Sequence, residues 1–318
     1  MSEPGSPPPI PLDVPGELAP LEPAPGATDA PANAFVNRLC IVAAAVMWSS
    51  SGFFAKNPAF DAWPSDQRGV LLAFWRALFA GLLILPAVRR PRWPIKLLPM
   101  IGSFAVMNVT YLSAMSLTTA ANAIWLQNTA PWWIFGVSVL VLREPLNRRD
   151  LFTLLPGALG VGLILLHEAG SESHIGVVCG LAAAVSYAGV IMSFRSLRGE
   201  DTFWLVSVNH LATAAILAPF VLWCGLWPSG WQWPLLVGFG FFQMALPYTL
   251  FGRGLRSISS QEAAAIALLE PILLPLWAFL VRGEKPAWWT VAGAAMILLG
   301  LILRYTWPSS ARAHLRSM

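Results

Sequence analysis

The chain has 318 residues, of which 56% are hydrophobic and only 11% are charged, with a formal net charge of +4. Soluble domains usually carry about 25% charged residues, so this composition excludes an ordinary soluble enzyme and favours a protein with many membrane spans. The basic residues are spread over short loops, which excludes a nucleic-acid-binding surface. Cys40, Cys179 and Cys224 lie in apolar runs with no CxxC pair, so we expect them to pack and not to form disulfides.

Residues 1–34 differ from the rest of the chain. They contain ten prolines and five acidic residues, with no Lys or Arg. Such a segment buries too little apolar surface to fold, so we expect a disordered cytoplasmic tail. It has no basic n-region followed by an apolar run and is therefore not a signal peptide.

Apolar runs bounded by charged or turn residues predict an all-α integral membrane protein with ten transmembrane helices. The predicted spans are 38–56, 69–88, 97–117, 121–142, 151–166, 175–195, 203–224, 233–252, 261–281 and 287–303. The loops between them are too short to form a soluble domain.

The distribution of Lys and Arg over the loops predicts the orientation of the spans. With the N-terminus in the cytoplasm, fifteen of these residues fall in inner segments and only Lys56, Arg68, Arg282 and Lys285 fall outside. One helix more or fewer would remove this bias. We therefore expect ten spans with both termini in the cytoplasm and a location in the cell (inner) membrane.

The chain also resembles itself at a spacing near 140 residues. The stretch "TAPWWIFGVSVLVLREP" aligns with "LEPILLPLWAFLVRGEKP", which places Pro131 on Pro271. Near the start of each half, Trp48 aligns with Tyr187. We expect one five-helix repeat over 35–170, a second over 171–304 and a short cytoplasmic tail over 305–318.

An odd number of spans per repeat requires the second copy to be inverted in the membrane. Inverted repeats build secondary transporters, whose sites lie between the repeats near the middle of the bilayer.

Three stretches carry a resemblance to a known family. They are "WSSSGFFAK" on the first predicted helix, "FWRALFAG" on the second, and "RE" or "GE" closing the fourth and ninth. Over about residues 36–304 the chain resembles EamA-type members of the drug/metabolite transporter superfamily, although "RE" stands where many members have Gly-Glu. The resemblance implies a ten-helix inner-membrane carrier that exports or exchanges small organic metabolites by alternating access.

Other signatures are absent from the sequence. Nothing matches GxxxxGK[ST], and there is no HExxH or paired Cys/His ligand set. We therefore expect no cofactor and no metal. A membrane-embedded enzyme acting on lipid-linked substrates is an alternative, but its acidic residues would have to cluster, and here they are scattered. A scaffold that binds a partner through residues 1–34 is a second alternative.

Arg76, His210 and Glu270 are ionisable residues deep inside predicted spans, and such residues are functional candidates because exposure to lipid is so costly. Similar depths in the membrane suggest that Arg76 and Glu270 form an ion pair or share a water. Alternatively, Arg76 clamps neighbouring carbonyls and Glu270 merely fastens helices. His210 is a candidate proton carrier, or else a hydrogen-bonded packing residue.

Polar and aromatic residues on several predicted helices could line one cavity together. They are Trp48, Asn108, Tyr111, Asn122, Trp125, Thr129, Tyr187, Gln243 and Tyr248. Such a lining suits amphipathic solutes such as amino acids or related metabolites.

Three prolines complete the expected pathway. Pro131, Pro271 and Pro275 should bend or loosen their helices, because each removes a helical hydrogen bond. The freed carbonyls are tolerable only beside protein or water, so these segments should face the cavity, with Glu270 at its border.

Overall fold

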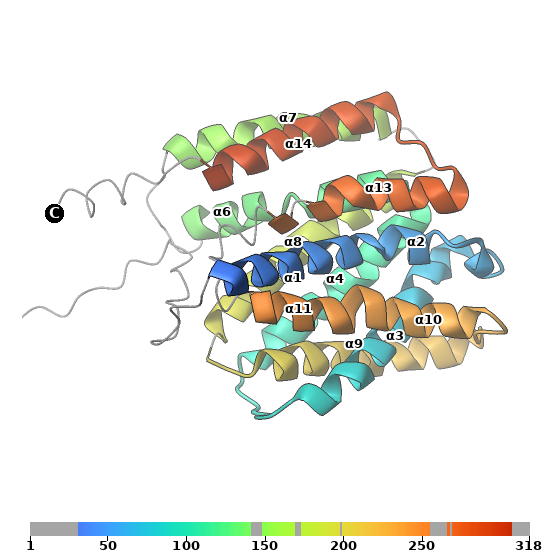
Figure 1. The fold of residues 1–318 in the computed structure, drawn as a ribbon. Helices are drawn as coiled ribbons and strands as arrows, with labels where there is room; N and C mark the ends of the chain where they lie inside the picture. Colours follow the sequence, from blue (N-terminus) through green and yellow to red (C-terminus); the bar gives the residue numbers. More distant parts are fainter. Residues whose placement is uncertain are drawn as a thin grey trace, which may run out of the picture.

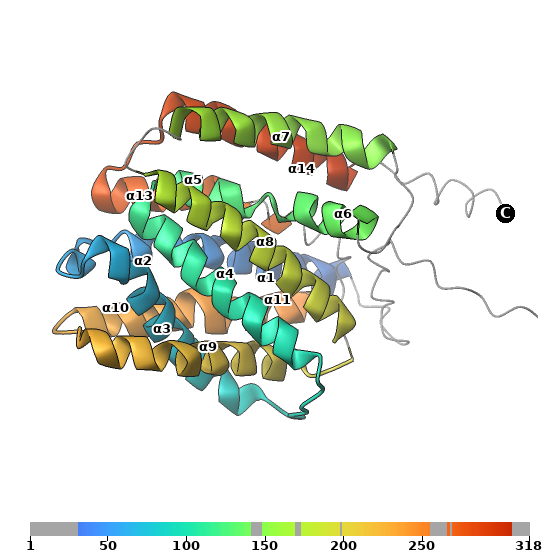
Figure 2. The same ribbon diagram turned by 180° about the vertical axis from the view of Figure 1, so that it is seen from behind.

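The computed structural model describes residues 31–140, 148–168, 173–197, 199–254, 266–267 and 269–306, and within these ranges all regular secondary structure is helical. The helices run roughly along one direction and form a single bundle (Figures 1 and 2). Of the expected disordered tail, only residues 31–34 are described, and they form the start of the first helix.

The helices of the first half are α1 (Pro31–Ser49), α2 (Ser51–Ala55), α3 (Ser65–Ile84), α4 (Leu97–Leu117), α5 (Ala120–Gln127), α6 (Ala130–Leu140) and α7 (Arg148–Glu168), with short 3₁₀ turns η1 (Pro58–Phe60) and η2 (Leu85–Ala87). Those of the second half are α8 (His174–Ser196), α9 (Thr202–Cys224), α10 (Gln232–Gly240), η3 (Phe241–Ala245), α11 (Leu246–Gly254), α13 (Leu269–Arg282) and α14 (Trp288–Thr306).

Every predicted span has a helical counterpart. Six helical stretches of the described residues are long and apolar enough to cross a membrane, and they coincide with the first, second, third, sixth, seventh and eighth predicted spans. Shorter apolar helices over 155–167 and 288–303 match the fifth and tenth. The fourth corresponds to α5 and α6 and the ninth to α13, with its earlier residues 261–265 outside the described ranges.

The packing partners follow the internal repeat. The helix α3 packs against its repeat counterpart α9, and α7 packs against α14. Contacts between non-equivalent helices also come in matched pairs, in which each helix is replaced by its counterpart in the other repeat. The contact of α4 with α8 is matched by that of α11 with α1, and the contact of α5 with α8 by that of α13 with α1. A two-fold relation between the halves requires this matching, and Figure 1 shows the α7–α14 pair lying side by side along one edge of the bundle.

Several spans are irregular. Ser50 separates α1 from α2, and residues Asn128 and Thr129 separate α5 from α6 directly before Pro131. The eighth span contains η3, one turn of π-helix, between α10 and α11. In a membrane such interruptions are tolerated where protein or water satisfies the freed backbone groups.

Glycines let α7 and α14 approach closely. A Cβ built on Gly293 would lie 2.7 Å from the carbonyl oxygen of Gly160, and a Cβ on Gly160 would clash with the carbonyl oxygen of Gly293. Small residues of this kind are the usual means by which helices associate in lipid. Elsewhere on α7, a Cβ at Gly162 would meet no heavy atom within 4 Å.

Gly160→Ala should therefore destabilise the protein, because a backbone atom of α14 has to move. We expect a loss of about 1–3 kcal/mol, measured as a lower thermal unfolding midpoint in detergent. The matched control is Gly162→Ala, which should be neutral or stabilising by about 0.4–1 kcal/mol. Equal midpoints for the two variants would contradict the close α7–α14 packing.

Candidate functional site

A buried arginine joins three helices inside the bundle. Arg76 on α3 is 1% exposed. Its Nη1 donates a hydrogen bond of 3.0 Å to Oε1 of Gln243, and its Nη2 donates to Oδ1 of Asn108 on α4. The guanidinium carbon lies 5.1 Å from the centroid of the Phe239 ring, which adds a cation–π contact. We call Arg76, Asn108, Gln243 and Phe239 the arginine site.

The irregular eighth span supplies half of this site. Phe239 belongs to α10 and Gln243 to η3. A Cβ on Gly240 would lie 2.8 Å from the backbone nitrogen of Ala80, so the segment lies directly against α3. Single π-helical turns occur frequently at functional sites, where they re-aim a side chain. Here the turn contains the glutamine that accepts from the guanidinium.

Some polar atoms around the arginine site have no partner among the described residues. They are Nε of Arg76, Nδ2 of Asn108, both amide atoms of Asn209 and Nε2 of His210. An unsatisfied buried polar group costs about 1–3 kcal/mol, so these atoms are candidate partners for water or a polar solute.

His210 on α9 is fixed in one tautomer. Its Nδ1 lies 2.8 Å from the carbonyl oxygen of Val206, which can only accept, so Nδ1 carries a proton. The ring packs against Phe104, with centroids 4.7 Å apart. His210 and Arg76 are close enough to interact electrostatically.

Glu270 on α13 lies near the arginine site without bonding to it. It interacts electrostatically with Arg76, Tyr111 and Tyr248. Among the described residues, however, no direct ion pair joins Arg76 and Glu270. The hydrogen bonds of the guanidinium go to the amides of Asn108 and Gln243, and a water shared by Arg76 and Glu270 stays a prediction.

Aromatic residues lie beside the same region. The Tyr111 hydroxyl and Ser51 Oγ are 3.0 Å apart, which ties α4 to α2. The Trp48 ring makes an edge contact with Tyr248 at 5.5 Å between centroids and a tilted contact with Phe251 at 5.0 Å. Trp48 thus contacts α11, and its place in the lining of a cavity stays a prediction.

Tyr187, the repeat counterpart of Trp48, differs from it in burial. It lies on α8 and is 38% exposed. The contacts of the arginine site named above do not include it.

The predicted stripe on the fourth span belongs to another region. Oδ1 of Asn122 accepts a hydrogen bond of 2.8 Å from Thr290 on α14. Oγ1 of Thr129 donates to the Leu126 carbonyl at the interruption between α5 and α6. Asn122 therefore bonds to α14, whereas the arginine site lies among α3, α4 and the eighth span.

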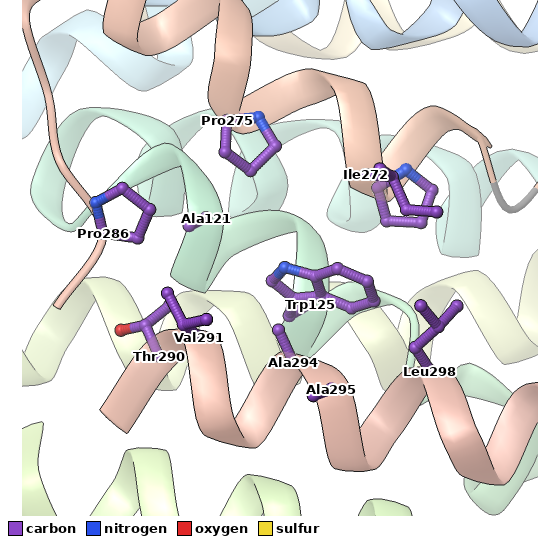
Figure 3. A pocket seen from close by; sticks show the side chains of 11 residues that line it. Ala121, Trp125, Ile272, Pro275, Pro286, Thr290, Val291, Ala294, Ala295 and Leu298 are labelled. Atoms are coloured by element: carbon purple, nitrogen blue, oxygen red, sulfur yellow. The ribbon is translucent and has the colours of Figure 1, made fainter. Parts of the chain in front are cut away.

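Trp125 lines an apolar crevice of about 260 Å³ between α5, α13 and α14 (Figure 3). Pro271 and Pro275 from α13 line the same crevice, with Pro286 and Thr290 at one end. Two of the three prolines predicted to matter therefore face a space at the boundary between the repeats. Pro131 is the second residue of α6, directly after the interruption.

Sequence reasoning missed an ion network at one end of the bundle. Lys56 Nζ lies 2.9 Å from a carboxylate oxygen of Glu284 and donates to the Thr118 carbonyl at 2.7 Å. The other Glu284 oxygen accepts from the backbone N–H of Ala120 at 2.5 Å, at the start of α5. These bonds join the first repeat to the second.

Three more charges extend the network. Asp61 lies 3.1 Å from Arg68 and 2.5 Å from Arg282, and Nε of Arg282 donates to the Lys56 carbonyl. The sequence contained a signal for this network. Its cations, Lys56, Arg68 and Arg282, are three of the four Lys and Arg residues that the loop charges predict on the outer side. Burial lowers the pKa of Lys56 below the ordinary 10.5, although Glu284 partly raises it.

Comparisons with known proteins point in one direction. The pattern of the EamA-like transporter family matches residues 38–166 and again 174–306. An uncharacterized transporter of Archaeoglobus fulgidus is 29% identical over 83% of this chain and 94% of its own length. The pseudopaline exporter CntI of Pseudomonas aeruginosa is 25% identical over 73% of this chain and 84% of its own. A solved structure that covers 86% of this chain and 95% of its own superposes with a TM-score of 0.58 at 21% identity, which supports the fold alone.

Arg76→Lys tests whether the planar guanidinium holds the arginine site together. Lysine keeps the charge but cannot bond Asn108 and Gln243 in one plane. Losing one hydrogen bond to a charged group should cost about 1.5–3 kcal/mol, measured as a lower thermal midpoint in detergent. Arg90→Lys, at an exposed position, is the matched control and should melt like the parent. An unchanged midpoint for Arg76→Lys would show that the two amides do not need the guanidinium.

The ion network makes a prediction about pH. Because the folded-state pKa of Lys56 is lowered, its amine should react with an acylating reagent at lower pH than an exposed lysine. Glu284→Gln removes the group that raises this pKa, so the midpoint for labelling should fall further. Peptide mass spectrometry reads Lys56 directly, with exposed Lys285 as internal reference. A midpoint that rises in Glu284→Gln would refute the pairing.

Proposed function

Because the chain belongs to the EamA-like transporter family, we propose that it is a secondary transporter that exports or exchanges small organic metabolites by alternating access. Family membership and the transporter relatives make the chain a multi-pass membrane transporter and not an enzyme. The alternative of a membrane-embedded enzyme is thereby removed. The inner membrane as its location, with both termini in the cytoplasm, is part of the proposal and rests on the loop charges.

The observation that carries the proposal is the composition of the arginine site. Arg76 and Asn108 come from the first repeat and Gln243 from the second, so the site spans the boundary between repeats, as in other inverted-repeat carriers. A buried cation with unpartnered donors beside it is costly in a membrane unless a solute or water uses them.

The chemistry of the site favours solutes that carry both charges. Nε–H of Arg76 and the Nδ2 group of Asn108 are donors suited to a carboxylate. Glu270 supplies an anion nearby for an amine, or for a proton if transport is proton-coupled. Trp48, adjoining Tyr248, offers aromatic surface for an apolar part. Amino acids and related amphipathic metabolites combine these features, and the name of the pseudopaline exporter supports export as the direction.

Alternating access needs one side of the bundle to open while the other closes. The ion network ties the two repeats at the end of the bundle where α2 ends and α5 begins, through Lys56 and Glu284. Opening that end would have to separate these charges. The interruption between α5 and α6, before Pro131, supports local bending of the span that begins with α5.

Glu270→Gln tests the proposal in proteoliposomes. The substitution keeps size and hydrogen bonding but removes the charge, so labelled amino-acid flux should fall about tenfold or more, the effect of about 1.4 kcal/mol of binding energy, or its pH dependence should change. Glu200→Gln, in the α8–α9 link, is the matched control and should transport normally.

Both variants are compared at matched amounts of inserted protein. Normal flux with an unchanged pH profile in Glu270→Gln would remove Glu270 from the mechanism. A parent protein that moves none of a panel of amino acids and related amphipathic solutes would contradict the proposed substrate class.

A further inference from the structure

The link between α3 and α4 is unusually basic and exposed. Residues 88–96 read "VRRPRWPIK", and we call them the basic loop. Arg89, Arg90, Arg92 and Lys96 are all exposed. Within the described part of the chain, none of these four side chains takes part in a hydrogen bond or ion pair, so their charges are available.

The backbone of the basic loop, in contrast, is held firmly. Oδ2 of Asp201 accepts from the backbone nitrogens of Arg89 at 2.8 Å and Arg90 at 3.1 Å. Nε1 of Trp204 donates to the Arg92 carbonyl at 2.6 Å. These contacts fix the backbone of the loop to the start of α9 and use none of its cationic side chains.

Asp201 stays ionised as it does this. Desolvation raises its pKa, but hydrogen bonds from the backbone N–H groups of Arg89, Arg90 and Phe203 outweigh it and lower the pKa below the ordinary value. Both of its carboxylate oxygens accept from backbone N–H groups, and within the described residues no ion pair joins Asp201 to an arginine side chain.

Large apolar side chains accompany the charges. Trp93 is 71% exposed and Ile95 is 76% exposed, and the Trp93 ring makes an edge contact with Trp204 at 4.9 Å. Leu98, in the first turn of α4, is also exposed. Tryptophan prefers the interface between headgroups and acyl chains, where most of the ring lies in apolar surroundings and the indole N–H can reach water.

We propose that the basic loop binds the headgroups of anionic phospholipids. It connects two membrane-spanning helices, so it lies at a membrane surface, and a cluster of four cations directly beside a span attracts anionic lipid. The exposed apolar side chains favour a lipid over a soluble anion, because only a lipid offers acyl chains next to its phosphate. This inference is independent of the transported solute.

The test measures lipid binding to the purified full-length chain by native mass spectrometry, with phosphatidylglycerol and phosphatidylcholine as probes. The parent should bind phosphatidylglycerol preferentially. In the triple variant Arg89→Gln, Arg90→Gln, Arg92→Gln, the phosphatidylglycerol affinity should fall about fivefold per cation removed, with phosphatidylcholine binding unchanged. The triple Arg→Lys variant keeps the charges and should bind like the parent.

A second variant tests the apolar part of the site. Ile95→Gln leaves every charge in place and should weaken phosphatidylglycerol binding. Thermal midpoints measured without added lipid show that each variant is folded.

Three results would overturn the proposal. One is equal phosphatidylglycerol affinity in the parent and the Gln triple variant. Another is displacement of phosphatidylglycerol by inorganic phosphate as effectively as by further phosphatidylglycerol, which would identify a site for a free anion. The third is full affinity in Ile95→Gln, which would remove the reason for choosing a lipid.

Discussion

The guanidinium of Arg76 is buried inside a bundle of helices whose surroundings are lipid, and much of the structure around it follows from that single charge. A cation in such a place is tolerable only with hydrogen-bond acceptors and an electron-rich surface beside it. Asn108 and Gln243 accept from it, and Phe239 lies over it. Because these partners come from α4 and from the eighth span, satisfying the charge fixes how three helices pack.

The same constraint explains why the irregular turns occur where they do. A π-helical turn in lipid would leave carbonyls unsatisfied, yet η3 is retained and contains the glutamine that meets Arg76. At the interruption between α5 and α6, the Thr129 hydroxyl bonds to the Leu126 carbonyl. At the interruption between α5 and α6 a polar side chain thus compensates for the distortion, and at η3 the distortion places a polar side chain against the buried cation.

Two polar regions connect the repeats at different depths. The arginine site does so inside the bundle through hydrogen bonds of a buried cation, and the ion network does so at one end through Lys56 and Glu284. The first arrangement is suited to holding a solute between the repeats. The second joins the repeats at one end of the bundle, where the side chains of Lys56 and Glu284 are largely buried, so separating them is costly unless each charge gains new partners.

The sequence by itself determined the class of protein and the places of its spans, because an apolar run of bilayer length bounded by charges has few other solutions. It also determined the repeat, and with it the helix pairings that a two-fold relation implies. Only the tertiary structure decided which polar residues meet. Helical periodicity places Asn122 and Asn108 on faces of their own helices, but the rotation of each helix in the bundle decides that Asn108 meets Arg76 while Asn122 meets Thr290. The pattern of apolar residues also does not show which face of a membrane-spanning helix packs on protein and which packs on acyl chains, because both faces are hydrophobic. That the guanidinium of Arg76 bonds to the amides of Asn108 and Gln243 is therefore something that the tertiary structure decides.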